Sequence, residues 1–251
     1  MPSAAAAPAF TYLPTGFDAL NGALGGGLVV GRIIEVFGHR HTWKTGLALH
    51  AACAVARRRS VAVMNVDDMV DEQGRRPGER LAGAMLDAGV DQRRVHLDSA
   101  SNAYETVFAN IEATVRARRT SLVVVDSVNG LAPLFGDPLP GWFARQAELQ
   151  RVEAAMLAAL RKICGAAHST GTTVLFCRTT GIEGYMGAVT REALGPLGNA
   201  LKVYASVRME VRRVRRGVAK VRVVKNQCGP RFSEAEVFVA GVEPEPADEL
   251  D

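Results

Sequence analysis

The segment VFGHRHTWKTGL at 36–47 constrains the fold of this chain more than any other stretch of its sequence. Gly38 is followed by four residues and then by Trp43, Lys44 and Thr45. This spacing matches the phosphate-binding loop G-x-x-x-x-G-K-[ST], with tryptophan in place of the second glycine. Such a loop joins a strand to a helix. The segment therefore predicts a strand–loop–helix unit with Gly38, Lys44 and Thr45 around a phosphate.

The flanking composition fits this unit, and the periodicity of the remaining chain extends it. Residues 32–37 (RIIEVF) have the composition of a strand, and residues 46–57 are rich in the alanine and leucine of a helix. Further strands are expected at 60–66, 95–97, 122–126, 172–177, 205–214, 219–224 and 235–239, and further helices at 79–88, 103–117 and 143–167. This order predicts an α/β fold, with a mainly parallel twisted sheet flanked by helices and a C-terminal antiparallel extension.

Trp43 stands where the motif requires a residue without a side chain. Glycine lets successive backbone N–H groups approach a phosphate closely. An indole at this position fills the phosphate site or forces the loop open, so that Lys44 and Thr45 face a reshaped pocket. The alternative is an ordinary strand–turn–helix with a chance lysine, and the loop sequence alone leaves both interpretations open.

Length and composition describe one globular domain. The 251 residues are 48% hydrophobic and 22% charged, as in ordinary globular proteins. We expect a flexible lead-in at 1–12, a core domain at 13–241 and an acidic disordered tail at 242–251. No apolar run has the roughly 18 residues of a membrane span, and the alanine-rich start lacks the features of a secretory signal. A cytoplasmic protein without membrane contacts is expected.

The thiols and imidazoles predict no metal centre. Free thiols in a reducing compartment are expected for the cysteines, because none has C-x-x-C spacing; they are Cys53, Cys164, Cys177 and Cys228. His39 and His41 lie inside the loop, where a zinc site is conceivable. Two solvated loop histidines are the simpler interpretation, because no third ligand is near in sequence.

Positive charge is concentrated near the C-terminal end of the predicted core. The net charge is +4, and residues 205–231 contain a single acid, Glu210. Their basic residues are Arg208, Arg212, Arg213, Arg215, Arg216, Lys220, Arg222, Lys225 and Arg231. Such a run either binds a polyanion or is a solvated hairpin whose charges prevent aggregation.

The apolar run LVVVD at 122–126 predicts a buried strand that presents Asp126 at its carboxyl end. Ligands of open α/β sheets gather at that edge, where a carboxylate can hold Mg²⁺ or its water shell. With Thr45, Asp126 is therefore a candidate for Mg²⁺ binding when a nucleotide is present. A core strand that ends in a turn aspartate is the alternative.

Longer segments resemble the core of the RecA recombinases over about residues 13–240. They are GALGGGLVVGRIIEVFG at 22–38, VVVDSVNGLAP at 123–133, AALRKICG at 158–165, GNALKVYASVRMEVRR at 198–213 and VRVVKN at 221–226. The resemblance implies a RecA-like nucleotide-binding core with ATP and Mg²⁺ as cofactors, single-stranded DNA as partner, and self-association. It also implies that Lys225 reaches the ATP of a neighbouring subunit.

The chain departs from the RecA pattern at several positions that the resemblance makes functional. Asp67 stands for the glutamate that activates the attacking water, which makes it a weak catalytic candidate. Cys177 and Arg178 stand where an asparagine–glutamine pair senses the terminal phosphate. Gln227 replaces the second lysine that reaches the neighbouring ATP, and Val203 replaces an interface aromatic. With Trp43 in the loop, these changes predict weak nucleotide binding and little or no hydrolysis.

The resemblance places two DNA-contacting loops at about 135–145 and 179–198. The second contains Tyr185 and Arg191 and follows Arg178. Stacking on such side chains, with phosphate contacts, suits weak and sequence-tolerant binding of single strands. We expect these residues and the basic set Arg212, Arg213, Arg215 and Arg216 to contact DNA. A disordered loop without a partner is the alternative.

Two functions of different class follow. The first is a RecA-like accessory protein or scaffold in damage-induced mutagenesis, similar to ImuA, with a RecA-type recombinase and an ImuB-type polymerase-like protein as partners on the bacterial nucleoid. The second is a compact, active DNA-dependent ATPase or recombinase. Lys202, Val203 and Arg208 match the RecA subunit interface. Since the chain lacks RecA's polymerisation arm, we expect it to cap or join filaments rather than build long ones. The acidic tail is either a partner-binding peptide or inert.

Overall fold

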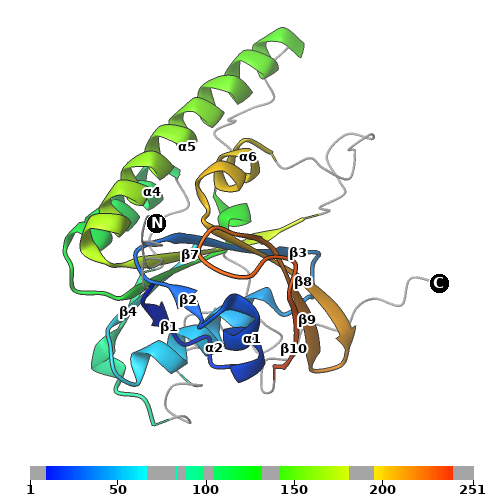
Figure 1. The fold of residues 1–251 in the computed structure, drawn as a ribbon. Coiled ribbons are helices and arrows are strands. Elements are labelled where there is room, and N and C mark those ends of the chain that lie inside the picture. Colours follow the sequence, from blue (N-terminus) through cyan, green and yellow to red (C-terminus); the bar gives the residue numbers. More distant parts are fainter. Residues whose placement is uncertain are drawn as a thin grey trace, which may run out of the picture.

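The computed structural model describes residues 10–66, 83, 89–98, 104–131, 142–180 and 195–239, which form a twisted sheet covered by helices on both faces (Figure 1). Its strands are β3 (Ile33–Gly38), β4 (Val61–Asn65), β5 (Val95–Asp98), β6 (Leu122–Asp126), β7 (Thr173–Thr179), β8 (Val207–Arg215), β9 (Val218–Asn226) and β10 (Glu234–Phe238). The main helices are α2 (Lys44–Ala56), α4 (Tyr104–Arg116), α5 (Trp142–Thr170) and α6 (Gly195–Tyr204).

The strand order in the sheet is β10-β9-β8-β3-β7-β6-β4-β5. From β8 to β5 all neighbours are parallel, whereas β9 and β10 continue the sheet as an antiparallel extension. The carboxyl ends of β3, β7, β6 and β4 therefore meet at one edge, where ligands of such sheets bind. The α/β fold expected from the sequence is confirmed.

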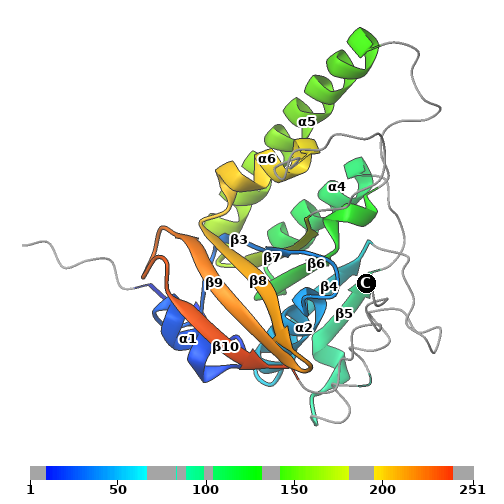
Figure 2. The same cartoon turned by 90° about the vertical axis from the view of Figure 1, so that its right-hand side faces the viewer.

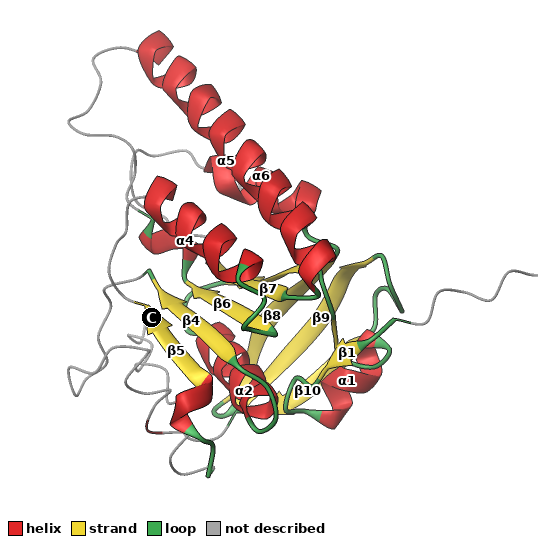
Figure 3. Cartoon of the chain, turned by 90° about the vertical axis from the view of Figure 1, so that its left-hand side faces the viewer, coloured by secondary structure: helices red, strands yellow, loops and turns green. Residues whose placement is uncertain are grey.

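Alternation along the strands divides the core between the two faces of the sheet. Ile34 and Val124 pack with α1 (Asp18–Leu24) and α2 on one face, while Ile33 and Val123 pack with α4, α5 and α6 on the other (Figure 3). Successive side chains of a strand point to opposite faces, so near-continuous apolar runs serve both layers. The same alternation places Glu35 on the α6 side, among apolar neighbours.

A small unit at the amino end was not predicted. It comprises β1 (Tyr12–Leu13), α1 (Asp18–Leu24) and β2 (Leu28–Val29), and α1 packs against β9 and β10 (Figure 2). The helix ends at Gly25, which adopts the left-handed φ of 82°. Strands of two residues give no periodic signal, so this unit escapes sequence patterns.

Most expected elements are present, with shifted ends. The turn at Gly217, with φ of 73°, joins β8 to β9 as predicted. Helix α5 begins at Trp142, inside the loop expected at 135–145, and α6 begins at Gly195, inside the loop expected at 179–198. Most of the helix expected at 79–88, and the tail at 242–251, lie outside the described residues. Within the described ranges no helix is long and apolar enough to cross a membrane.

Candidate nucleotide and nucleic-acid site

The loop between β3 and α2 keeps the predicted strand–loop–helix course. Gly38 ends β3, and α2 begins at Lys44. A Cβ on Gly38 would lie 2.2 Å from the carbonyl oxygen of Val211 in β8, so the strand pair admits no side chain at this position. Gly38 is thus required by close backbone packing as well as by the motif.

Trp43 occupies the left-handed conformation that the missing glycine would take. Its φ is 69° and ψ 18°, and the indole is only 6% exposed within the hydrophobic cluster that includes Leu47. An L-residue in this conformation costs about 1–2 kcal/mol. Burial of the ring offsets that cost, but Nε1 is buried without a hydrogen-bond partner. The indole therefore packs into the core, and the loop is not forced open.

Lys44 turns back toward its own loop. Its Nζ donates to the carbonyl oxygen of His39 at 2.5 Å and approaches Oγ1 of Thr42 at 3.4 Å. Burial lowers the pKa of Lys44 to about 8, against the opposing influence of Cys177 and Asp126. Part of its positive charge is therefore lost just above neutral pH, which weakens attraction for a phosphate. Thr45 follows at the second position of α2 and is half-buried.

Asp126 and Cys177 lie beside Lys44 at the carboxyl ends of β6 and β7. Asp126 is 4% exposed, and the fully buried thiol of Cys177 donates weakly toward the carbonyl oxygen of Lys44 at 4.0 Å. Burial raises the pKa of Cys177 well above its usual value, and the charge of Asp126 adds to this effect. The thiol therefore stays protonated and neutral. Lys44, Thr45 and Asp126 are the residues that would hold a nucleotide phosphate and its Mg²⁺.

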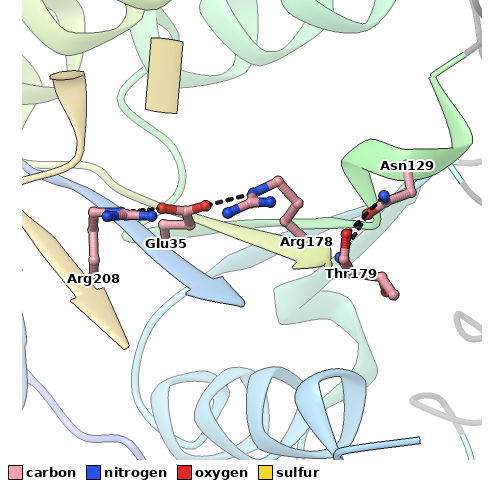
Figure 4. Close-up of polar contacts among 5 residues, drawn as sticks. All are labelled: Glu35, Asn129, Arg178, Thr179 and Arg208. Atoms are coloured by element: carbon pink, nitrogen blue, oxygen red, sulfur yellow. Dashed lines mark hydrogen bonds and ion pairs between the residues drawn. The ribbon is translucent and has the colours of Figure 1, made fainter. Parts of the chain in front are cut away.

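Arg178, expected at the DNA surface, is buried instead. Its Nε donates to Oε1 of Glu35 at 2.7 Å, and Nε of Arg208 donates to the other carboxylate oxygen (Figure 4). Both guanidinium groups lie near the ring of Phe37, with centroid distances of 5.4 Å for Arg178 and 4.7 Å for Arg208. Because Arg178 is 4% exposed, the structure assigns it to this ion pair rather than to a DNA contact.

Asn129 is a site residue that the sequence analysis missed. Its side-chain Oδ1 accepts from the backbone N–H of Thr179 at 2.6 Å, and its Nδ2 donates to the carbonyl of Thr179 at 3.0 Å (Figure 4). On the opposite side, the N–H of Thr180 donates to the carbonyl of Gly38 at 2.8 Å. The end of β7 is thereby fixed between the phosphate loop and the turn after β6. Nothing in the sequence near Asn129 signals this contact.

The residues predicted at a subunit interface are brought together at the end of α6. Nζ of Lys225 donates to the carbonyl oxygens of Lys202 and Val203 at 3.0 and 3.2 Å. Burial, and then the charge of Arg208, lowers the pKa of Lys225. The side chain of Val203 is 63% exposed beside these cations. The group Lys202, Val203, Arg208 and Lys225 is called the α6 corner below.

The basic hairpin of β8 and β9 contains paired and unpaired arginines. Arg212 pairs with Glu210 at 2.9 Å, and Glu234 holds Lys220 at 2.6 Å. Arg213 and Arg215 are exposed and have no carboxylate partner among the residues that the structure describes. Arg216 lies in the turn. The hairpin therefore offers Arg213 and Arg215 most directly to a polyanion.

Three predicted site residues lie outside the described ranges: Asp67, Tyr185 and Arg191. Their roles stay predictions. His39 and His41 belong to no cluster of three metal-ligating side chains within the described part of the chain.

Comparison with known proteins identifies the family of this chain. Residues 4–242 match the family described as RecA N-terminal domain. The chain is 35% identical over 240 residues to Protein RecA of Prochlorococcus marinus (strain MIT 9303), covering 89% of this chain and 58% of that protein. It is likewise 35% identical over 240 residues to Protein RecA 1 of Myxococcus xanthus, covering 89% and 64%. It is 33% identical over 242 residues to Protein RecA of Campylobacter lari, covering 90% and 65%. The chain thus spans about three fifths of the length of these relatives, and it belongs to the RecA family.

Proposed function

We propose that this chain is a DNA-repair accessory protein that binds ATP weakly and hydrolyses it slowly or not at all. The main support is the phosphate loop, where Trp43 takes the conformation of the missing glycine. Lys44 donates a hydrogen bond to the carbonyl of His39, and its pKa is lowered. A phosphate would have to displace that bond and reach an amine whose charged form burial already disfavours. Cys177 and Arg178, in place of a sensing amide pair, add to the loss.

An active DNA-dependent ATPase is the second candidate, and three features of the site support it. The helix still begins at Lys44, the indole is withdrawn into the core, and Asp126 lies at the neighbouring strand end. These features supply a backbone cradle, a cation and a carboxylate for Mg²⁺. Asp67, the candidate for positioning the attacking water, would complete the site.

Nucleotide binding and turnover separate the two candidates. Calorimetry with ATP and Mg²⁺ should give weak binding by the wild type and no binding by Lys44→Ala. Trp43→Gly should bind ATP more tightly if the side chain at position 43 limits the affinity, and as the wild type does if the bond and lowered pKa of Lys44 limit it. Steady-state hydrolysis by the wild type should stay at background, with or without single-stranded DNA. ATP hydrolysis that single-stranded DNA stimulates and Lys44→Ala abolishes would show that the protein is an active ATPase and would contradict the accessory proposal.

We propose single-stranded DNA as the nucleic-acid partner. Support comes from the exposed Arg213 and Arg215 on the hairpin and from the composition of the loop that carries Tyr185 and Arg191. Phosphate contacts by arginine with stacking on an aromatic ring give salt-sensitive, sequence-tolerant affinity. Such a partner places the protein on the nucleoid in the cytoplasm.

We propose the α6 corner as the contact with a RecA-type recombinase. An exposed Val203 among cations offers an apolar centre with a charged rim, as protein interfaces have. A role like that of ImuA in translesion synthesis adds an ImuB-type polymerase-like partner, with the acidic tail as its candidate contact. Pull-down of purified RecA-type and polymerase-type proteins by the wild type, by Val203→Glu and by a variant lacking 243–251 tests both contacts. Unchanged capture by either variant would eliminate the corresponding surface.

A further inference from the structure

The cluster around Glu35 contains more positive than negative charge. Glu35 is fully buried, and its two carboxylate oxygens are used by Nε of Arg178 and Nε of Arg208. Lys225 lies close enough for Arg208 and Glu35 to influence its pKa, which burial lowers. Two cations thus contact one buried carboxylate, with a third cation nearby, in a region where water screens poorly.

The guanidinium of Arg178 also keeps an unused hydrogen-bond donor. Only 5% of the side chain is exposed, yet the buried Nη2 has no hydrogen-bond partner among the residues that the structure describes. A buried N–H without an acceptor costs free energy, which an oxygen from a ligand would restore. The guanidinium carbons of both arginines lie over the ring of Phe37, so the ring covers part of their surroundings and leaves Nη2 of Arg178 as the donor to be satisfied.

This cluster is distinct from the phosphate loop. Cys177 packs on the α2 face with the loop, whereas Arg178 is the next residue of β7 and points to the α6 face. The two regions are nevertheless coupled, because the charge of Arg178 helps to lower the pKa of Lys44. A double negative charge matches the excess of cations better than the single charge of a carboxylate.

We infer that Arg178 and Arg208 form an oxyanion site for a phosphate group, either free or at the end of a larger ligand. Guanidinium groups match phosphate oxygens with two parallel N–H donors. Arg208, with 11% of its side chain exposed, and the half-buried Lys225 would form the solvent side of this site. The site goes beyond the proposed function, because it requires neither nucleotide binding at Lys44 nor DNA.

Inorganic phosphate is the probe that tests the site. Its binding is measured by calorimetry, and by thermal unfolding in phosphate against chloride at equal ionic strength. Lys44→Ala, which disables the loop, should bind phosphate as the wild type does. Arg178→Gln should weaken binding at least tenfold, and Arg58→Gln, at an exposed arginine after α2, should not change it. Phosphate binding that Lys44→Ala abolishes, or no binding by the wild type, overturns the inference.

Arg208→Lys gives a second test that keeps the charge beside Glu35. This variant lacks the paired N–H donors of a guanidinium group, so phosphate should bind at least tenfold more weakly. The midpoint of thermal unfolding in chloride should stay within a few degrees of the wild type. Unchanged phosphate affinity in this folded variant would also overturn the site. The source of the phosphate is then found with Lys44→Ala. If a nucleoside triphosphate competes with inorganic phosphate for binding to this variant, the site takes a terminal phosphate of a larger ligand. If it does not compete, the site takes free phosphate.

Discussion

The side chain of Asn129 pairs with the backbone of Thr179 as a neighbouring strand would, through one accepted and one donated hydrogen bond. The β6–β7 ladder ends at Val125 and Phe176, and this amide continues it three residues further along β7. On its β6 side, the strand end beside the phosphate loop is therefore held by a side chain, whereas on its other side Thr179 still pairs with Gly38 of β3.

Asn129→Ala should release the end of β7. Two neutral hydrogen bonds at an exposed position contribute about 1–2 kcal/mol to the free energy of unfolding, which urea denaturation measures. The local effect should be larger, since the amide of Thr179 loses its acceptor and should exchange with deuterium much faster. Unchanged exchange at Thr179 would show that the sheet alone holds this strand end.

Trp43→Gly should make the protein less stable. Removing the buried ring costs about 3–5 kcal/mol, of which relief of the left-handed strain returns about 1–2. Thermal or urea unfolding gives the net loss of roughly 2–3 kcal/mol. Trp43→Phe is the matched control, because it keeps a buried ring, removes the unpartnered N–H and should stay closer to the wild type. Equal losses in both variants would mean that the indole N–H has a partner in solution.

Glu35→Gln should be among the most destabilising single changes in the chain. It leaves Arg178 and Arg208 buried without their carboxylate, and breaking a buried pair in this way costs about 3–5 kcal/mol. Glu234→Gln makes the same chemical change at the exposed pair with Lys220, where solvent screens the charges, and should leave stability nearly unchanged. Similar unfolding curves for the two variants would contradict the burial of the Glu35 cluster.

Lys44 should make stability depend on alkaline pH. Its pKa falls from 10.5 to about 8 on folding, so between these values the unfolded chain holds a proton that the folded chain has released. Stability therefore rises with pH through this range. The variant Lys44→Met lacks this dependence and should be more stable than the wild type at pH 7.5. The difference between their free energies of unfolding should shrink by about 2 kcal/mol between pH 7.5 and 10. A constant difference between the two urea midpoints would show that Lys44 titrates normally.

Replacing Arg213 and Arg215 together by alanine should weaken binding of single-stranded DNA. Loss of two phosphate contacts should reduce the slope of log K against log salt by roughly 1.4. The control removes the same charge from Arg58 and Arg59, which are exposed at the end of α2. Fluorescence anisotropy at several salt concentrations measures both slopes, and equal slopes would remove the hairpin from the DNA surface.

The sequence predicted the sheet well because β-branched runs such as LVVVD have few other stable arrangements than buried parallel strands. Helix α6 was placed partly in a loop, because the RecA resemblance extended the second DNA-contacting loop to residue 198. The small unit formed by β1, α1 and β2 was missed because it is held together by packing against β9 and β10 rather than by periodicity.

Within the site, the local sequence located Gly38, Lys44 and Asp126. It did not predict the contacts that neighbouring residues make. Arg178 was expected to contact DNA because it directly precedes the loop that the RecA resemblance places on DNA. Its partner Glu35 is 143 positions away and becomes a neighbour only through the pairing of β3 with β7. The burial of Trp43 likewise depends on how α2 packs on the sheet, which no pattern within the loop encodes.

The contact between Gly38 and Val211 changes how variation in the phosphate loop should be interpreted. Because the carbonyl of Val211 leaves no room for a Cβ, a saturation library selected only for folding would return glycine at position 38. Invariance at this position would therefore say nothing about phosphate. At position 43 the backbone accepts an indole, so the fold does not demand glycine there, and glycine at that position would record selection for nucleotide use.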